Sequence, residues 1–102
     1  MKDVHQAYTV FKTAYPELAR QIDATSHALR VQGGPLDERT CALVKLAAAA
    51  ASRHQRAVET HLVAAREAGV SEAEIEHALL LLVTTCGFPT FMEAYSTYKK
   101  MG

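Results

Sequence analysis

A chain of 102 residues, 49% of them hydrophobic, is long enough for one domain with one modest core, and we expect that domain to span residues 1–102. Its 11 basic and 11 acidic side chains balance, which argues against nucleic acid and anionic membranes as partners and permits self-association. No apolar stretch approaches the roughly 20 residues that span a bilayer, and residues 1–10 carry no secretory signal. We therefore expect a cytoplasmic protein with free thiols at Cys41 and Cys86.

The first two predicted elements are helices over residues 3–14 and 16–32, because helix-favouring residues dominate and no strand-like alternation occurs. Pro16 suits the first turn of a helix, where its missing N–H costs nothing. The second helix has an imperfect apolar face that consists of Leu18, Ile22, Leu29 and Val31. The run Gly33-Gly34-Pro35 then ends this helix and is the clearest break in the chain.

Capping signals predict four more helices, over residues 37–51, 52–69, 71–87 and 89–100. Ser52 and Ser71 each precede a Gln or Glu by three residues, which is the spacing of a capping box at a helix start. Gly69 and Gly87 stand where two of these helices end, as is typical of a C-cap. Since the turns are tight, we expect an all-α fold of about six helices in a compact antiparallel bundle.

The helix over residues 71–87 has an unusually extensive apolar surface. Its main stripe consists of Ile75, Ala78, Leu79, Leu82, Val83 and Cys86. Leu80 and Leu81 lie off that stripe and are apolar too, so this part of the helix needs cover on most sides. We predict that residues 78–83 lie partly in a subunit interface.

Two histidines, His54 and His61, are the candidate functional residues. They are seven residues apart, so a helix places both on one face, which is the apolar face of Val58, Leu62 and Ala65. A histidine there is either a core residue hydrogen-bonded to a neighbouring helix, which spacing alone favours, or a tunable acid or base. Two helical turns separate the pair by about 10 Å, too far to share one zinc ion, so we expect no metal.

Four segments of the chain form a recognisable series. They read Leu-Asp-Glu-Arg-Thr (36–40), His-Leu-Val-Ala-Ala-Arg-Glu-Ala-Gly (61–69), Val-Ser-Glu-Ala-Glu-Ile (70–75) and Cys-Gly-Phe-Pro-Thr (86–90). Over residues 36–101 this series resembles the carboxymuconolactone decarboxylase-like family, which includes the alkylhydroperoxidase D-like proteins. The resemblance implies a fold of the alkylhydroperoxidase D-like type and a homo-oligomer, either a trimer or a hexamer.

The redox motif of the alkylhydroperoxidase D-like branch is Cys-x-x-Cys-x-x-x-His with an upstream glutamate. Laid on this chain, the histidine of the motif matches His61, but the two cysteines fall on His54 and Ala57 and the glutamate on Ala42. The dithiol mechanism needs a resolving thiol beside the nucleophilic one, so it does not carry over. The chain is closer to the branch that lacks the cysteine pair and keeps the histidine, and its own two thiols are expected to be packed and inert.

Three hypotheses for the function remain. The first is a decarboxylase-like lyase, with no cofactor, that acts on a small carboxylated, lactone-type substrate, with His61 as general acid or base and His54 assisting. In this hypothesis, Arg53 or Arg56 binds a carboxylate from the rim, unless both are merely solvated. The second is a peroxiredoxin-type alkylhydroperoxidase, which the missing cysteine pair disfavours. The third is a non-catalytic oligomeric scaffold that binds a small ligand.

Overall fold

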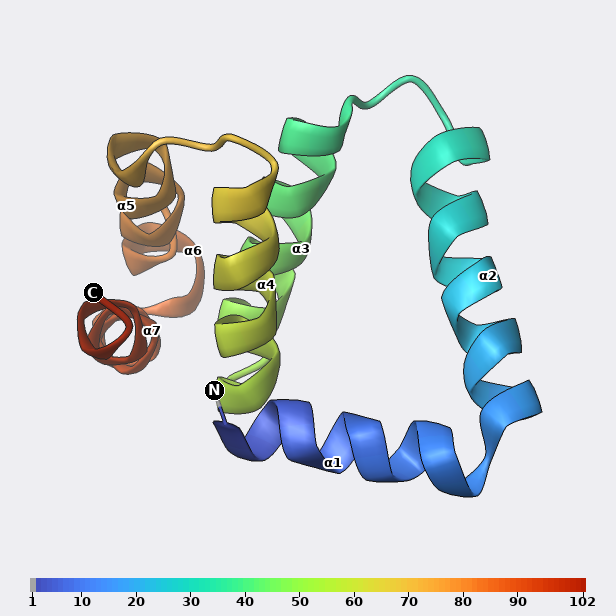
Figure 1. Ribbon diagram of the computed structural model, residues 1–102. Coiled ribbons are helices and arrows are strands. Elements are labelled where there is room, and N and C mark those ends of the chain that lie inside the picture. The colour runs from blue at the N-terminus through green and yellow to red at the C-terminus, as the bar shows by residue number, and fades with distance from the viewer. Residues whose placement is uncertain (1) are drawn as a thin grey trace. The chain divides into compact units, whose positions relative to one another are not determined.

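The protein is all-α, as predicted. The computed structural model describes residues 2–102, which form helices and, within that range, no strand (Figure 1). Side chains are described from Gln6 onward. None of the helices in this part of the chain is both long and apolar enough to cross a membrane. The chain divides into two compact units, of which the first ends at Asp37 and the second spans Glu38–Gly102.

The first unit consists of two helices at the predicted positions, α1 (Lys2–Ala14) and α2 (Pro16–Gln32). They meet at a corner at Tyr15 (Figure 1), directly before the proline that opens α2. The Tyr8 hydroxyl of α1 donates a hydrogen bond of 2.5 Å to the Asp23 carboxylate of α2 and so links the two helices.

The apolar face predicted for α2 is not a buried face. Its residues are 49–67% exposed: Leu18, Ile22, Leu29 and Val31. Ala19, by contrast, is only 1% exposed. Burial therefore stabilises α2 less than its apolar pattern predicts, because stabilisation follows the apolar area that is removed from water.

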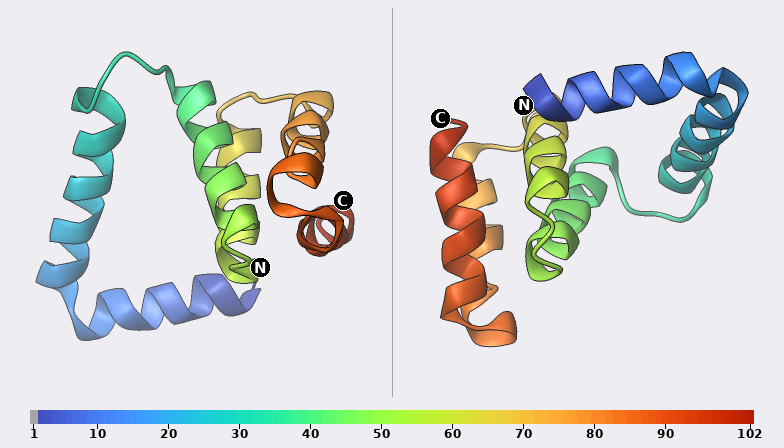
Figure 2. Two further views of the ribbon diagram at one scale, coloured as in Figure 1. Left: turned by 180° about the vertical axis from the view of Figure 1, so that it is seen from behind. Right: turned by 90° about the horizontal axis from the view of Figure 1, so that it is seen from below.

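The second unit carries the main core. Its helices are α3 (Glu38–Ala51), α4 (Gln55–Glu67), α5 (Glu72–Leu80), α6 (Val83–Cys86) and α7 (Phe88–Lys100). The largest fully buried side chains come from three of them and are Leu46, Leu62, Ile75 and Leu79. α7 contacts α3, α4 and α5, and so closes the core that these helices share (Figure 2).

The single helix predicted over residues 71–87 is divided into α5 and α6. At the break, the Leu82 N–H bonds to the carbonyl oxygen of Leu79 at 3.0 Å, one residue nearer than in an α-helix, so the chain tightens there. Leu82 is buried, whereas Leu80 and Leu81 are 53% and 60% exposed. Within this chain, the apolar segment is therefore covered on one side only.

The capping-box pattern is correct at α5 and wrong at α4. Ser71 accepts a hydrogen bond from the Glu74 N–H, and the Glu74 carboxylate accepts one from the Ser71 N–H. Gly69, with a φ of 86°, follows the end of α4 as predicted. The box expected at Ser52 is absent because its N–H continues the hydrogen bonding of α3 to Ala48, and α4 begins only three residues later.

Candidate functional site

A groove between α3 and α4 is lined by both candidate histidines. The two helices lie side by side and run in opposite directions from the short turn that joins them (Figure 1). The groove has a volume of about 300 Å³, which is in the range of small-molecule sites. Its lining residues are Lys45, Ala48, Ala49, Ser52, His54, Ala57 and His61.

These lining residues follow one face of each helix. α3 supplies Lys45 and, one turn later, two alanines, and Ser52 follows directly after the end of this helix. α4 supplies His61, and His54 lies two turns earlier at its start. Because the helices are antiparallel, Lys45 and His61 lie at one level of the groove, about 10 Å along the helix axes from Ser52 and His54.

His61 is half-buried and available for chemistry. It lies at the edge of the apolar face, since the neighbouring Val58, Leu62 and Ala65 are 2%, 0% and 0% exposed. Its imidazole forms no hydrogen bond with any residue that the structure describes. Because no fully buried polar side-chain atom among these residues lacks a partner, the imidazole nitrogens are open to the solvent in the groove. Burial, and then the charge of the nearby Lys45 ammonium, lower the pKa of His61. At neutral pH the imidazole is therefore neutral and faces the groove.

His54 lines the same groove, but the prediction that it lies on the buried face of the helix is wrong. It is exposed and occupies the N-cap position of α4, with a φ of −93°, and its side chain makes no capping hydrogen bond. The reason is the late start of α4, which leaves residue 54 in the turn rather than in the helix.

Lys45 is the residue of this site that the sequence analysis missed. It is half-buried on α3, and its positive charge lies close enough to His61 to lower the pKa of the imidazole. A signal was available, because Lys45 is the only charged residue between Thr40 and Ser52, in an alanine-rich helix that otherwise reads as a packing surface.

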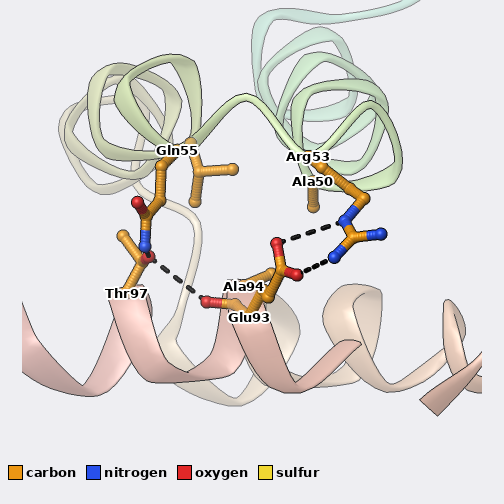
Figure 3. Close-up of a pocket in the computed structure, with 7 residues that line it drawn as sticks. Ala50, Arg53, Gln55, Glu93, Ala94 and Thr97 are labelled. Atoms are coloured by element: carbon orange, nitrogen blue, oxygen red, sulfur yellow. Dashed lines mark hydrogen bonds and ion pairs between the residues drawn. The ribbon is translucent and has the colours of Figure 1, made fainter. Parts of the chain in front are cut away.

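A second hollow, where the turn between α3 and α4 meets α7, is too small for a substrate. Its volume is about 10 Å³, roughly that of one water molecule. Figure 3 shows that Arg53 and Glu93 point toward one another across it and form an ion pair, and that Gln55 points toward Thr97. The Gln55 amide donates to the Thr97 hydroxyl at 3.3 Å. These contacts hold the turn that carries His54 against α7.

The backbone of this turn is strained at Arg53. Its φ of 60° lies in the left-handed region, which costs a non-glycine residue roughly 1–2 kcal/mol. The Arg53 N–H bonds to the Ala50 oxygen and the His54 N–H to the Ala49 oxygen, both at 3.1 Å, which is the Schellman pattern. The Arg53 guanidinium forms an ion pair with Glu93, and Arg56 does not line the groove. Neither arginine therefore lies where the sequence analysis expected one to bind a substrate carboxylate at the rim.

Neither thiol contributes to the groove. Cys41 is half-buried near the start of α3, and neither cysteine forms a disulfide with a residue that the structure describes. Cys86 is exposed at the end of α6, so the expectation of a packed thiol is wrong there, because the break before α6 leaves the last turn outside the core. Among the described residues, no group of three or more His, Cys, Asp or Glu side chains is placed to bind a metal ion.

The comparison with known protein families matches residues 16–99 to the carboxymuconolactone decarboxylase family. The chain belongs to this family. The match begins at the first residue of α2 and ends within the last turn of α7. It therefore includes α2 as well as most of the second unit, and it is longer than the resemblance noted over residues 36–101. No curated protein matches the sequence.

Proposed function

We propose that this member of the carboxymuconolactone decarboxylase family is a cofactor-independent decarboxylase, and that the groove between α3 and α4 is its active site. The substrate is a small carboxylated lactone, His61 is the general acid or base, and His54 assists. The observation that carries the proposal is the position of His61. It is a half-buried imidazole without a hydrogen-bond partner among the described residues, and it opens onto a groove of substrate size.

The proposed reaction releases CO₂ and needs one proton. The bond between the ring carbon and the substrate carboxylate breaks, and its electron pair passes into the lactone carbonyl as an enolate. An anionic substrate favours the protonated form of His61, which then gives its proton to the ring carbon and returns to the neutral state. His54 donates a hydrogen bond to the enolate oxygen, and solvent restores the proton on His61 before the next turnover.

A thiol-dependent hydroperoxidase is disfavoured by the residues at the motif positions. Residues 54 and 57, where that branch carries its cysteines, are His54 and Ala57 and line the groove. Cys41 and Cys86 are not groove residues. The proposal therefore includes the absence of dithiol-dependent reduction of cumene hydroperoxide. Turnover that Cys41→Ser or Cys86→Ser abolishes would contradict it.

The proposal also includes self-association. Leu80 and Leu81, in the segment predicted to lie at a subunit interface, are large apolar side chains that this chain leaves more than half exposed. A homo-oligomer, a trimer or a hexamer as the family resemblance implies, would cover them. Light scattering that reports an 11.1 kDa particle at micromolar concentration would contradict this part.

The test of catalysis uses α-carboxy-γ-butyrolactone, in which the carboxylate is placed so that its loss generates an enolate. We expect release of CO₂ by the wild-type protein and a loss of kcat of about 10²-fold or more in His61→Gln. His77→Gln is the matched control, because His77 is an exposed histidine of α5 outside the groove. Turnover that survives in His61→Gln would overturn the role of His61. Binding without any turnover in the wild type would instead favour a non-catalytic scaffold.

A further inference from the structure

The charge of the groove is distributed in favour of an anion. Its polar lining consists of the Lys45 ammonium, two imidazoles and the Ser52 hydroxyl, and none of its described lining residues is acidic. Three alanine methyl groups complete the lining. A ligand in this groove therefore meets one full positive charge and several hydrogen-bond donors, but no carboxylate that would repel an anion.

Lys45 has no counter-ion among the residues that the structure describes. The arginines of this unit that form ion pairs have carboxylate partners elsewhere, for example Arg39 with Glu74 and Arg66 with Glu72, at 2.5 and 2.9 Å. No such partner is present for Lys45, although its side chain is half-buried. An ammonium without a counter-ion is stabilised when a carboxylate arrives, because charge-assisted hydrogen bonds are stronger than neutral ones.

The position of Lys45 along the groove is also specific. It lies at the level of His61, at the opposite end from Ser52 and His54. A carboxylate bound by Lys45 would therefore place the carbon that carries it next to the His61 imidazole. The remainder of a small ligand would lie over the alanine surface toward Ser52, along a path of about 10 Å.

We propose that Lys45 binds the carboxylate of the substrate beside His61, so that the groove selects small monocarboxylates over their neutral analogues. This inference rests on the proposed function, because it assigns the residue that recognises the substrate carboxylate at the same site. The competing explanation is that the Lys45 stem merely covers apolar surface while its ammonium reaches water. In that case, substitution of Lys45 would change the stability of the protein but not its preference for the charged ligand.

The experiment measures binding without turnover. The probes are γ-butyrolactone-γ-carboxylate, whose loss of CO₂ would give no enolate, and the primary amide of the same acid. Each is titrated into protein with isotope-labelled histidines while the imidazole NMR signals of His61 and His54 are followed. The variants are Lys45→Met, which keeps length and removes charge, and Lys45→Arg, which keeps charge. Arg56→Met is the control, because it removes a positive charge of α4 outside the groove.

We expect the wild type and Arg56→Met to bind the carboxylate roughly tenfold or more tightly than the amide, with shifts at His61. Lys45→Met should lose this preference, and Lys45→Arg should retain most of it. A preference that persists in Lys45→Met would overturn the role of Lys45 and leave that of His61 intact. Absence of any shift at both histidines with both probes would overturn the groove as the binding site, and with it the proposed function.

Discussion

Replacement of two adjacent leucines in α5 tests both the core and the proposed subunit contact. Leu79 is completely buried, whereas Leu80 is 53% exposed, so Leu79→Ala and Leu80→Ala make the same chemical change in two environments. Leu79→Ala should lower the free energy of unfolding by about 3 kcal/mol, the usual range being roughly 2–5 kcal/mol, because it removes buried methyl groups and leaves a cavity. For a domain of this size, that corresponds to a fall in Tm of roughly 15 °C.

Leu80→Ala should change the free energy of unfolding by less than about 0.5 kcal/mol if Leu80 faces only water. If Leu80 packs against another subunit, as proposed, its replacement lowers Tm by an amount that depends on protein concentration, since association stabilises the folded state by mass action. Urea and thermal unfolding, followed by circular dichroism at two protein concentrations, measures both effects. A loss below about 1 kcal/mol in Leu79→Ala would refute the placement of α5 in the core. If the fall in Tm caused by Leu80→Ala does not depend on protein concentration, the proposed subunit contact at Leu80 is refuted.

Three further predictions follow from the charges and the backbone of the second unit. The pKa of His61 is lowered in the folded state, so its contribution to stability is present above the ordinary histidine pKa of about 6.5 and is lost as pH falls. Urea midpoints measured between about pH 5 and pH 7.5 should therefore fall less steeply toward low pH in His61→Gln than in the wild type. Arg53→Gly should be about 1 kcal/mol more stable to urea than Arg53→Ala, since only glycine adopts a φ of 60° without strain, and equal stability would contradict this. Burial and hydrogen bonds to Glu72 and Glu76 raise the pKa of Tyr98 to about 12. An ultraviolet titration should therefore show a late step that is missing in Tyr98→Phe. The contribution of Tyr98 to stability is complete below about pH 10 and is lost as pH rises through about 12.

The parts of the fold that the sequence predicted are those specified by local chemistry. A proline starts α2, and a glycine that adopts a positive φ ends α4. At α5, the reciprocal hydrogen bonds of Ser71 and Glu74 lie within four consecutive residues. Each of these signals acts within one turn of helix, so it can be recognised without knowledge of the tertiary structure.

The predictions are wrong where two local backbone structures compete for the same residues, or where contacts between residues far apart in the sequence determine the structure. Ser52 has the spacing of a capping box, but the chain forms a Schellman turn through Arg53, a residue that does not normally signal a left-handed backbone. Its ion-pair partner, Glu93, is forty residues away and cannot be recognised from the spacing. This turn delays the start of α4, and His54 is exposed for that reason. Lys45 was missed similarly, since its proximity to His61 depends on how α3 and α4 are paired.

The alanine-rich segment of α3 illustrates how one residue type can serve both packing and function. Ala49 and Ala50 are 8% and 2% exposed, and their small size lets α4 approach closely, as the sequence pattern indicates. Ala48 is exposed and lines the groove, where a larger side chain would occupy the space left for a ligand. Close approach of the two backbones also brings Lys45 to the level of His61. The same run of alanines therefore packs the helix pair and leaves a shallow site on one side of it, so that an apolar pattern alone does not separate a packing surface from the floor of a binding site.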